Sequence, residues 1–214
     1  LTGIKWEPVY DFVYQAPPAT VDPVLVAVID TGVDYTHPDL QGRVTLGYGA
    51  YDWVNRDDNP MDDNGHGTHV AGLVAATADN GLGIAGVAGM VYARILPHKV
   101  LDSTGLGDVM NIAAAIMHAA DHGAAIINLS LGTVDPETGL PVHSDVLEEA
   151  VAYAQSRGAL VVAAAGNQAD YQNYPTEGLI GSPADIPGVL TVGATQQSTP
   201  WRTSFSNYGP QLDV

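Results

Sequence analysis

The sequence lacks cysteine altogether and has few basic and aromatic residues. The absence of cysteine excludes disulfides, thiolate zinc sites and a cysteine nucleophile. Lys and Arg number 7 against 24 Asp and Glu, which gives a formal charge of −17. Nucleic-acid binding needs a basic surface, so we expect no nucleic-acid partner. No apolar run reaches the ~18 residues of a membrane-spanning helix, so we expect no membrane partner.

The excess of acidic residues has two compatible explanations. One is a soluble surface whose like charges repel each other. The other is that some carboxylates bind hard cations such as Ca²⁺. Because 24 acidic residues are far more than two metal sites would use, both explanations can hold.

The chain length and composition indicate one folded unit. The 214 residues, 46% of them hydrophobic, suffice for one sizeable core, so we expect a single domain over residues 1–214. The first residue is Leu1 rather than Met and no signal peptide is seen, which fits a processed or excised product. Gln211–Val214 has neither a helix stop nor a polar tail, so we expect these residues to lie in a strand.

Short apolar runs alternate with helix-like segments along the chain. Because their hydrophobicity is continuous, the runs indicate strands covered on both faces, as in the parallel sheet of an α/β protein. The predicted strands are Val24–Ile29, Ala93–Leu96, Ala125–Leu129, Ala159–Ala164 and Val189–Val192. The predicted helices are Thr68–Thr77, Asp108–Asp121 and Ser144–Arg157, the last two followed by the C-cap glycines Gly123 and Gly158. The two long predicted loops are Asp52–Asp63 and Gln168–Ile186.

Asp30 directly follows the first predicted strand. Active sites of open α/β sheets lie at the carboxyl ends of the strands, so this position suits a carboxylate that orients a histidine. A structural turn cap, helped by Thr31 and Gly32, is the alternative. Asp34 is the rival acid, but it lies past the turn and is expected to be solvated.

His66 lies in Asn64–Gly72, where glycines allow a tight turn before a helix expected to start near Thr68. A histidine at such a junction can project into a cleft, and a hydrogen-bonded structural role is the alternative. His69 is expected to point into the packing. Two histidines three residues apart also suggest a metal site, but no Glu stands between them as the zinc-protease motif requires.

Asn167 ends the segment Ala163–Asn167, which follows a predicted strand. Its small residues let a ligand approach the backbone closely. The Asn amide offers the N–H donor that a developing oxyanion needs. A plain strand-to-loop turn is the alternative.

Taken in order, these motifs resemble the subtilisin-like serine proteases, the subtilase or peptidase S8 family, with features of its thermitase-like branch. The resemblance runs from Leu25 to Val214. Its blocks are Val26–Asp34, His37–Leu40, Asn64–Gly72, Gly83–Ala88, Lys99–Leu101, Ile127–Gly132, Ala163–Asn167, Val192–Ala194 and Ser204–Ser206. It implies a three-layer α/β/α fold with a central, mainly parallel sheet, of which the C-terminal part is missing here.

The resemblance implies a serine endopeptidase that hydrolyses peptide bonds in proteins through an Asp-His-Ser triad. Asp30 would hold the imidazole of His66, which would act as general base and then as general acid, while His69 would be structural. Asn167 would be the side-chain donor of the oxyanion hole, a contribution of ~3 kcal/mol to transition-state stabilisation. Proteins or peptides are therefore the expected substrates of a monomeric enzyme.

The resemblance also implies where a peptide would bind. Two backbone edges would sandwich it as an extended strand. They are Gly105, Leu106 and Gly107 on one side and Ser130, Leu131 and Gly132 on the other. Ala164, Ala165 and Gly166 would form a wall of the pocket for the residue before the scissile bond. Because these walls are small, we expect a roomy, mainly apolar pocket and broad specificity.

One or two structural Ca²⁺ sites are implied as well. The ligands of the first would be the side chains of Asp39 and Asn80 with carbonyl groups of Ala78, Leu82 and Ile84. The family's usual N-terminal ligand cannot be placed, because Leu1–Asp22 departs from the common pattern.

The acidic loop before His66 resembles the second calcium site of the thermitase-like branch. Its ligands would be Asp52, Asp57 and Asn59, whose clustered oxygens suit Ca²⁺. Asp62 and Asp63 would either assist or be exposed, and a merely solvated acidic loop is the alternative. Since calcium sites fill where calcium is plentiful, we expect a secreted protein.

The family's nucleophile block, Gly-Thr-Ser-Met-Ala, has no counterpart in the sequence, and the resemblance places it roughly two dozen residues past Val214. We therefore expect a C-terminally truncated sequence that hydrolyses no peptide alone. We also expect it to aggregate unless another polypeptide supplies the missing segment. That segment and a propeptide are further expected partners.

Two alternatives to a truncated endopeptidase differ in the residues expected after Val214. A non-catalytic subtilase-like binding module would be favoured by loss of Asp30 or His66, and neither is lost. One fragment of a nicked two-chain protease would have its C-terminal piece as a separate chain. The downstream nucleotide sequence and the intact mass of the natural protein separate these cases.

Overall fold

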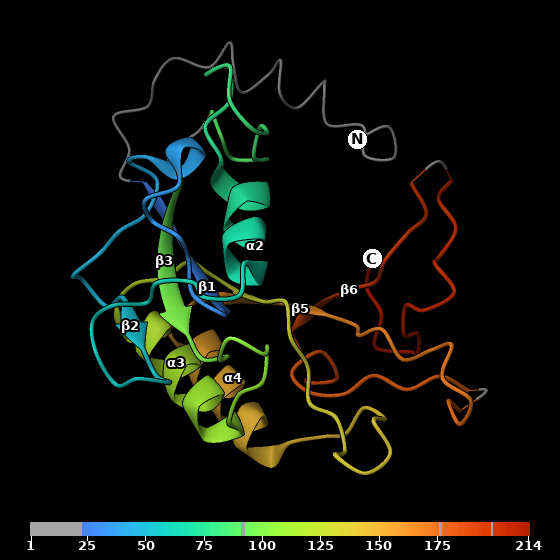
Figure 1. Cartoon of the computed structure of the whole chain (residues 1–214). Coiled ribbons are helices and arrows are strands. Elements are labelled where there is room, and N and C mark those ends of the chain that lie inside the picture. Colours follow the sequence, from blue (N-terminus) through green and yellow to red (C-terminus); the bar gives the residue numbers. More distant parts are fainter. Residues whose placement is uncertain (1–22, 91–92, 176, 198) are drawn as a thin grey trace.

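The computed structural model describes residues 23–90, 93–175, 177–197 and 199–214, and these contain one six-stranded sheet (Figure 1). The strand order is β2-β3-β1-β4-β5-β6, and every neighbouring pair is parallel. The strands are β1 (Val24–Asp30), β2 (Tyr51–Asp52), β3 (Ala93–Lys99), β4 (Ile126–Leu129), β5 (Leu160–Ala164) and β6 (Leu190–Val192). The predicted α/β fold with a mainly parallel sheet is confirmed.

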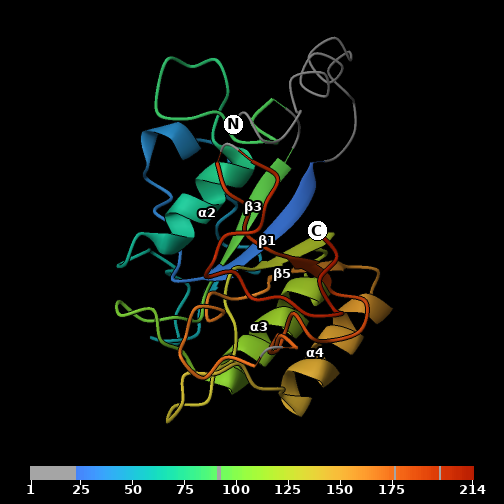
Figure 2. The same ribbon diagram turned by 90° about the vertical axis from the view of Figure 1, so that its right-hand side faces the viewer.

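Helices cover both faces of the sheet. Alternate residues of β1 point to opposite faces, and the apolar side chains on each face pack against helices. Val26 and Val28 pack in a cluster with Ala71 and Ala75 of α2 (His66–Ala75). The intervening Ala27 and Ile29 belong to a larger cluster shared with α3 (Val109–Asp121) and α4 (Asp145–Ser156). Figure 2 shows α2 on one side of the strands and α3 and α4 on the other. This arrangement is the predicted α/β/α layering.

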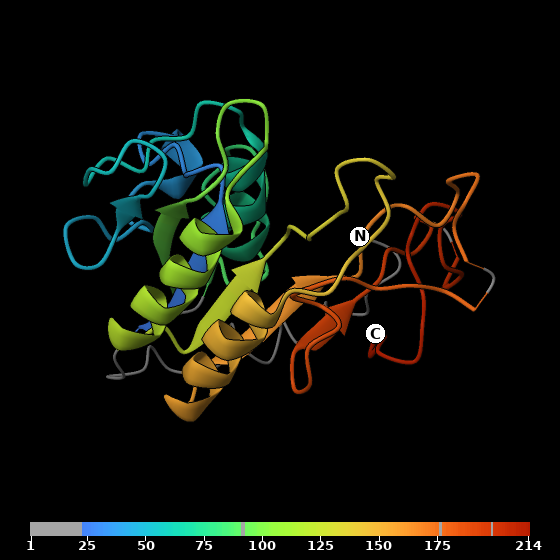
Figure 3. The ribbon, with the colours of Figure 1, turned by 90° about the horizontal axis from the view of Figure 1, so that it is seen from below.

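The two helices on the larger core, α3 and α4, lie side by side (Figure 3) and have well-defined ends. The side chains of Asp108 and Ser144 cap their N-termini by accepting hydrogen bonds from the amides of Met110 and Leu147. Gly123 and Gly158 follow their C-termini with φ of 79° and 87°, as predicted for C-cap glycines. None of the described helices combines the length and apolar character needed to cross a membrane.

Three details of the expected secondary structure are wrong. The first helix begins at His66 rather than near Thr68, so His66 belongs to its first turn. Tyr51–Asp52 forms an edge strand with β3, whereas Asp52 was expected in a loop. Residues 211–214 form no strand, although the amides of Asp213 and Val214 donate to the Thr191 carbonyl at the end of the sheet.

Candidate active site

Asp30 and His66 meet at the carboxyl end of the central strand. Asp30 is the last residue of β1 and has no exposed surface. His66 opens α2, and its Nδ1 lies 2.7 Å from Asp30 Oδ1 while 49% of its side chain is exposed. The chain therefore brings together one buried carboxylate and one accessible imidazole from residues far apart in the sequence.

The Asp30 carboxylate is buried, and its hydrogen bonds only partly offset the loss of hydration. Burial raises the pKa of Asp30, and the hydrogen bonds from His66 and from the Thr31 amide oppose this rise. Its second oxygen, Oδ2, is buried with no hydrogen-bond partner among the described residues. Such a carboxylate is well placed to fix the Nδ1–H tautomer of the imidazole and to stabilise the imidazolium when Nε2 takes up a proton.

Asp62 organises the turn that presents His66. Its Oδ1 accepts hydrogen bonds from the Thr31 hydroxyl and from the amides of Asn64 and Gly65. Its Oδ2 accepts from the amide and hydroxyl of Thr68. Burial opposes ionisation, but these hydrogen bonds outweigh it and lower the pKa of Asp62. Asp62 is thus neither simply exposed nor free, which the sequence did not reveal.

Lys99, the last residue of β3, is a buried cation beside the site. Its Nζ donates to the carbonyls of Thr31 and Leu101 at 2.8 and 2.9 Å, and it pairs with the Asp63 carboxylate at 2.5 Å. A buried ammonium is stable only when it is paired and hydrogen-bonded. These contacts hold the carboxyl ends of β1 and β3 together, and they give Asp63 a partner that sequence reasoning missed.

A cleft of about 820 Å³ lies in front of His66. All six residues predicted for the two peptide-binding edges line it: Gly105, Leu106, Gly107, Ser130, Leu131 and Gly132. The side-chain amide of Asn64 donates to the Ser103 carbonyl and so ties the His66 turn to the first edge. The structure therefore places the predicted edges and His66 around one cleft, while their role in binding a peptide stays a prediction.

A smaller pocket adjoins this cleft, since Ser130, Leu131 and Gly132 line both. Ala164, Ala165 and Gly166, the three residues predicted for a pocket wall, form part of its lining, and so does Asn167, which was predicted as the oxyanion donor. The pocket has a volume of about 120 Å³, and the polar residues Gln168 and Asn207 share its lining. The expectation of a roomy, mainly apolar pocket for the residue before the scissile bond stays a prediction.

Asn167 is held by a pair of amide side chains. Gln168 Oε1 accepts hydrogen bonds from the backbone N–H of Asn167 and from Asn207 Nδ2. The backbone N–H of Gln168 donates in turn to Asn207 Oδ1. Asn167 itself is exposed and lines the pocket, and its role as oxyanion donor stays a prediction. The sequence analysis did not single out Asn207, because no local pattern indicates its contact with Gln168, which lies 39 residues earlier in the chain.

The expectation that His69 points into the packing is wrong. It lies exposed on α2, one turn from His66, and the core residues of this helix are Gly67, Ala71 and Ala75. Because its position is exposed, His69 has no structural role that the described contacts support.

The first predicted calcium site has its acidic and amide side chains in contact. Asp39 is buried, and its two oxygens accept from Asn80 Nδ2 at 2.7 Å and from the Ile84 amide at 2.9 Å. A Cβ added at Gly83 would clash with Asp39 Oδ2, so the loop wraps tightly around this carboxylate. A carboxylate and an amide are side chains of the type that Ca²⁺ takes as ligands, and calcium binding here stays a prediction. Leu1–Asp22, where a further ligand was sought, lies outside the described residues.

In the second predicted calcium site, the side chains of Asp52 and Asp57 accept hydrogen bonds from within the loop, and that of Asn59 accepts one from Tyr35 outside it. Asp52 is buried, and its carboxylate accepts from the amides of Val54 and Asn55. Asp57 accepts from the Asn59 amide, and Asn59 Oδ1 accepts from the Tyr35 hydroxyl. This order rules out a merely solvated loop for Asp52, and calcium binding there stays a prediction.

Comparison with known proteins identifies the class. The model of the subtilase family matches residues 22–214, so the chain belongs to this family. It is 49% identical over 189 residues to a thermophilic serine proteinase of Bacillus sp. (strain AK1) and 42% identical over 190 residues to thermitase of Thermoactinomyces vulgaris. Each match covers 88% of this chain, but only 42% and 61% of those relatives.

Solved structures agree with this assignment. A structure of proteases from Pseudoalteromonas arctica is 31% identical with a TM-score of 0.75, and the match covers 92% of this chain and 63% of that one. A cold-adapted subtilisin-like serine proteinase gives a TM-score of 0.69 at 31% identity, covering 89% and 61% of the two chains. The predicted subtilisin-like fold is therefore confirmed.

Proposed function

We propose that the complete protein is a serine endopeptidase and that Asp30 and His66 are two members of its catalytic triad. The observation that carries this proposal is the 2.7 Å contact between Asp30 Oδ1 and His66 Nδ1 at the edge of the large cleft. Membership of the subtilase family supports it.

In the proposed mechanism, Asp30 keeps the His66 proton on Nδ1, so that Nε2 accepts the proton of an attacking serine hydroxyl. His66 then donates this proton to the leaving amine. The Asn167 side chain donates to the oxyanion that forms on the carbonyl carbon. The edges at residues 105–107 and 130–132 hold the substrate backbone as a strand between them.

The attacking serine is proposed to lie outside these 214 residues. Among the described residues, no serine hydroxyl is hydrogen-bonded to His66, whose ring contacts Asp30 instead. The chain spans about half of the length of the relatives it matches, which supports a longer protein. The 214-residue chain alone is accordingly proposed to be inactive.

Calcium binding and secretion belong to the same proposal. Asp39 and Asn80, with carbonyls of Ala78, Leu82 and Ile84, would hold one Ca²⁺, and Asp52, Asp57 and Asn59 would contribute to a second. Bound Ca²⁺ would cross-link loops and take no part in proton transfer. Oxygen-rich loop sites of this kind suit an extracellular setting, where calcium is plentiful.

The test uses the protein encoded by the complete gene and a peptide substrate. The Asp30→Asn variant should lose about 10⁴-fold in kcat, because the imidazole would adopt the wrong tautomer. His66→Ala should lose about 10⁶-fold. His69→Ala is the matched control, since it removes an exposed histidine from the same helix. Retention of near-normal activity by His66→Ala would refute the assignment, and a complete protein with no proteolysis would favour a binding module.

A further inference from the structure

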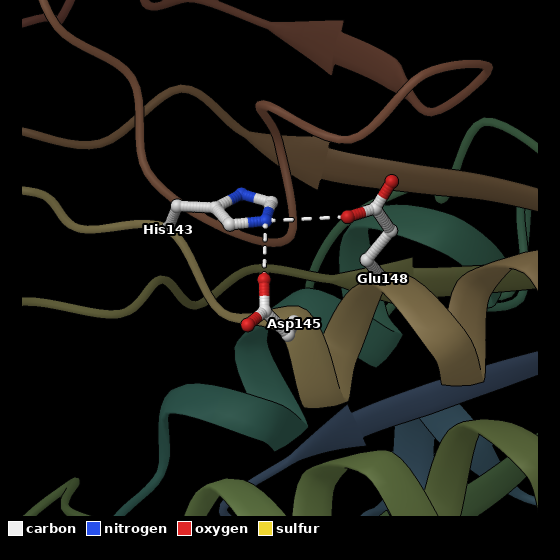
Figure 4. Close-up of side chains that lie close together, drawn as sticks. All are labelled: His143, Asp145 and Glu148. Carbon is white, nitrogen blue, oxygen red and sulfur yellow. Dashed lines mark ion pairs between the residues drawn. The ribbon is translucent and has the colours of Figure 1, made fainter.

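A second histidine–carboxylate cluster lies outside the Asp30–His66 site, at the start of α4 (Figure 4). His143 Nε2 is 3.4 Å from Asp145 Oδ1 and 3.3 Å from Glu148 Oε2. In the described part of the chain, these three residues are the one group of His, Asp and Glu whose potential ligand atoms all lie within 4.8 Å of one another. All three are exposed, so an ion from solution can reach them.

The imidazole of His143 is oriented from its other side. Its Nδ1 is 2.7 Å from Asp185 Oδ2, on a side chain that is only 11% exposed. The other oxygen of Asp185 accepts from the hydroxyl of Ser182, which is fully buried. With Nδ1 facing Asp185, Nε2 is the ring nitrogen that faces Asp145 and Glu148, and a metal ion would replace the proton that Nε2 shares with these carboxylates. A carboxylate behind the histidine is the arrangement that orients metal-binding imidazoles in proteins.

The His143 ring is closer to its carboxylate partner at Nδ1 than to its two carboxylate partners at Nε2. A charge-assisted N–H···O bond measures about 2.7–2.9 Å, which the contact with Asp185 satisfies. The Nε2 contacts with Asp145 and Glu148 are longer and shared between two oxygens. Tetrahedral Zn²⁺ binds N and O ligands at about 2.0–2.1 Å, which sets its ligand atoms about 3.3–3.4 Å apart. The Nε2–oxygen separations match that spacing.

We propose that His143, Asp145 and Glu148 bind a divalent transition-metal ion of the Zn²⁺ type, with water in the remaining position and Asp185 as the positioning residue behind His143. The imidazole ligand distinguishes this site from the proposed calcium loops, because Ca²⁺ takes oxygen ligands whereas imidazole suits Zn²⁺ and its neighbours in the first transition row.

The ion would join segments that border the small pocket. The Val142 amide donates to the Thr133 carbonyl, and the Ser182 amide donates to the Val142 carbonyl. Pro141 and Gly181, on these same two segments, line the pocket together with Asn167. A metal on His143 and α4 would therefore fix the pocket wall to the helix, and its binding should raise the melting temperature of the protein.

The test measures Zn²⁺ binding to chelator-treated protein by isothermal titration calorimetry, with Ca²⁺ present at constant excess. The unaltered protein should show a micromolar Zn²⁺ site, which His143→Ala should abolish. Glu148→Gln should weaken binding at least tenfold, and Asp185→Asn about 10- to 100-fold. Glu149→Gln is the matched control, because Glu149 is the adjacent exposed acid of α4 outside the cluster, and it should bind like the unaltered protein.

Circular dichroism of each variant checks that it is folded, and all the exchanged ligands are on the surface. Anomalous diffraction from a zinc-soaked crystal should place the ion between His143, Asp145 and Glu148. Zinc binding that is equally strong in His143→Ala, an ion found only at other histidines, or no binding below millimolar Zn²⁺ would each overturn the proposal.

Discussion

Asp62 shows how a single residue can control a site without touching the reacting atoms. Its carboxylate receives hydrogen bonds from Thr31, beside Asp30, and from the backbone on both sides of His66. Removing it would leave several donors of the turn unpaired, and misplacing a catalytic imidazole by about 1 Å can reduce a rate by roughly 10²-fold.

Asp62→Ala in the complete enzyme should therefore lower kcat by roughly 10- to 100-fold while changing KM little, because the peptide edges lie elsewhere. Steady-state kinetics on a peptide substrate measures both constants. Asp58→Ala, at an exposed acid of the same loop, should leave both unchanged. An increase in KM alone would mean that Asp62 acts on substrate binding rather than on His66.

His98 is a second residue whose surroundings predict a measurable property. It is fully buried on β3, where Trp53 Nε1 donates to its Nδ1 and the ring of His118 packs 5.4 Å away. Burial, followed by the nearby His118 and His122, lowers the pKa of His98 to about 3. The folded state therefore resists protonation that the unfolded chain accepts near pH 6.5.

Because the pKa of His98 is lower in the folded state, its contribution to stability is complete above pH 6.5 and is lost as the pH falls towards 3. Urea unfolding between pH 7 and pH 4 should show this loss. His98→Gln keeps an acceptor for Trp53 but cannot be protonated, so its free energy of unfolding should fall less over this range. His69→Gln serves as the control, and parallel pH profiles for the protein and His98→Gln would contradict the prediction.

At the scale of elements, the strand runs and helix periodicities predicted most of the architecture. The continuous apolar run before Asp30 became the central strand, with partners on both sides. The edge strand β2 was not predicted, because a strand of two residues has no hydrophobic periodicity to detect. The start of α2 was predicted two residues too late, because the glycines around His66 fit a turn as well as the first turn of a helix. The site could be predicted at strand ends, but the contacts of Asp62, Lys99 and Asn207 depend on long-range packing that no local pattern encodes.

The loop at residues 78–84 contacts one buried carboxylate at several points. It folds around the Asp39 carboxylate, which is buried and accepts hydrogen bonds from Asn80 and Ile84. If Ca²⁺ binds there, chelation should leave this negative charge without its cation.

Adding EDTA should therefore lower the melting temperature, and Asp39→Asn should both lower it and reduce the effect of EDTA. Differential scanning calorimetry with and without Ca²⁺ measures these shifts. Asp58→Asn is the control for the loss of one negative charge. An EDTA effect of equal size in Asp39→Asn would place the stabilising ion elsewhere.

At the scale of the whole molecule, the formal charge of −17 opposes compactness. Raising the salt concentration from 0.01 M to 1 M shortens the screening length from about 30 Å to about 3 Å. The midpoint of urea unfolding should therefore rise with NaCl, at constant Ca²⁺. A midpoint that stays constant or falls would mean that favourable ion pairs, such as Lys99 with Asp63, outweigh the repulsion.

The order of the strands in the sheet has a consequence for how the chain assembles. β1 is the first described strand to be synthesised, yet its neighbours are β3 and β4, so Val26 waits for Ile95 and Ile126 before it is paired. Sheets built from such distant pairings fold slowly, because the loop-closure entropy is spent before the contacts form. During translation, the strand that ends at Asp30 therefore remains an unpaired apolar segment until β3 (Ala93–Lys99) has emerged, and one of its edges stays open until β4 (Ile126–Leu129) follows. This is the interval in which a chaperone would protect it best.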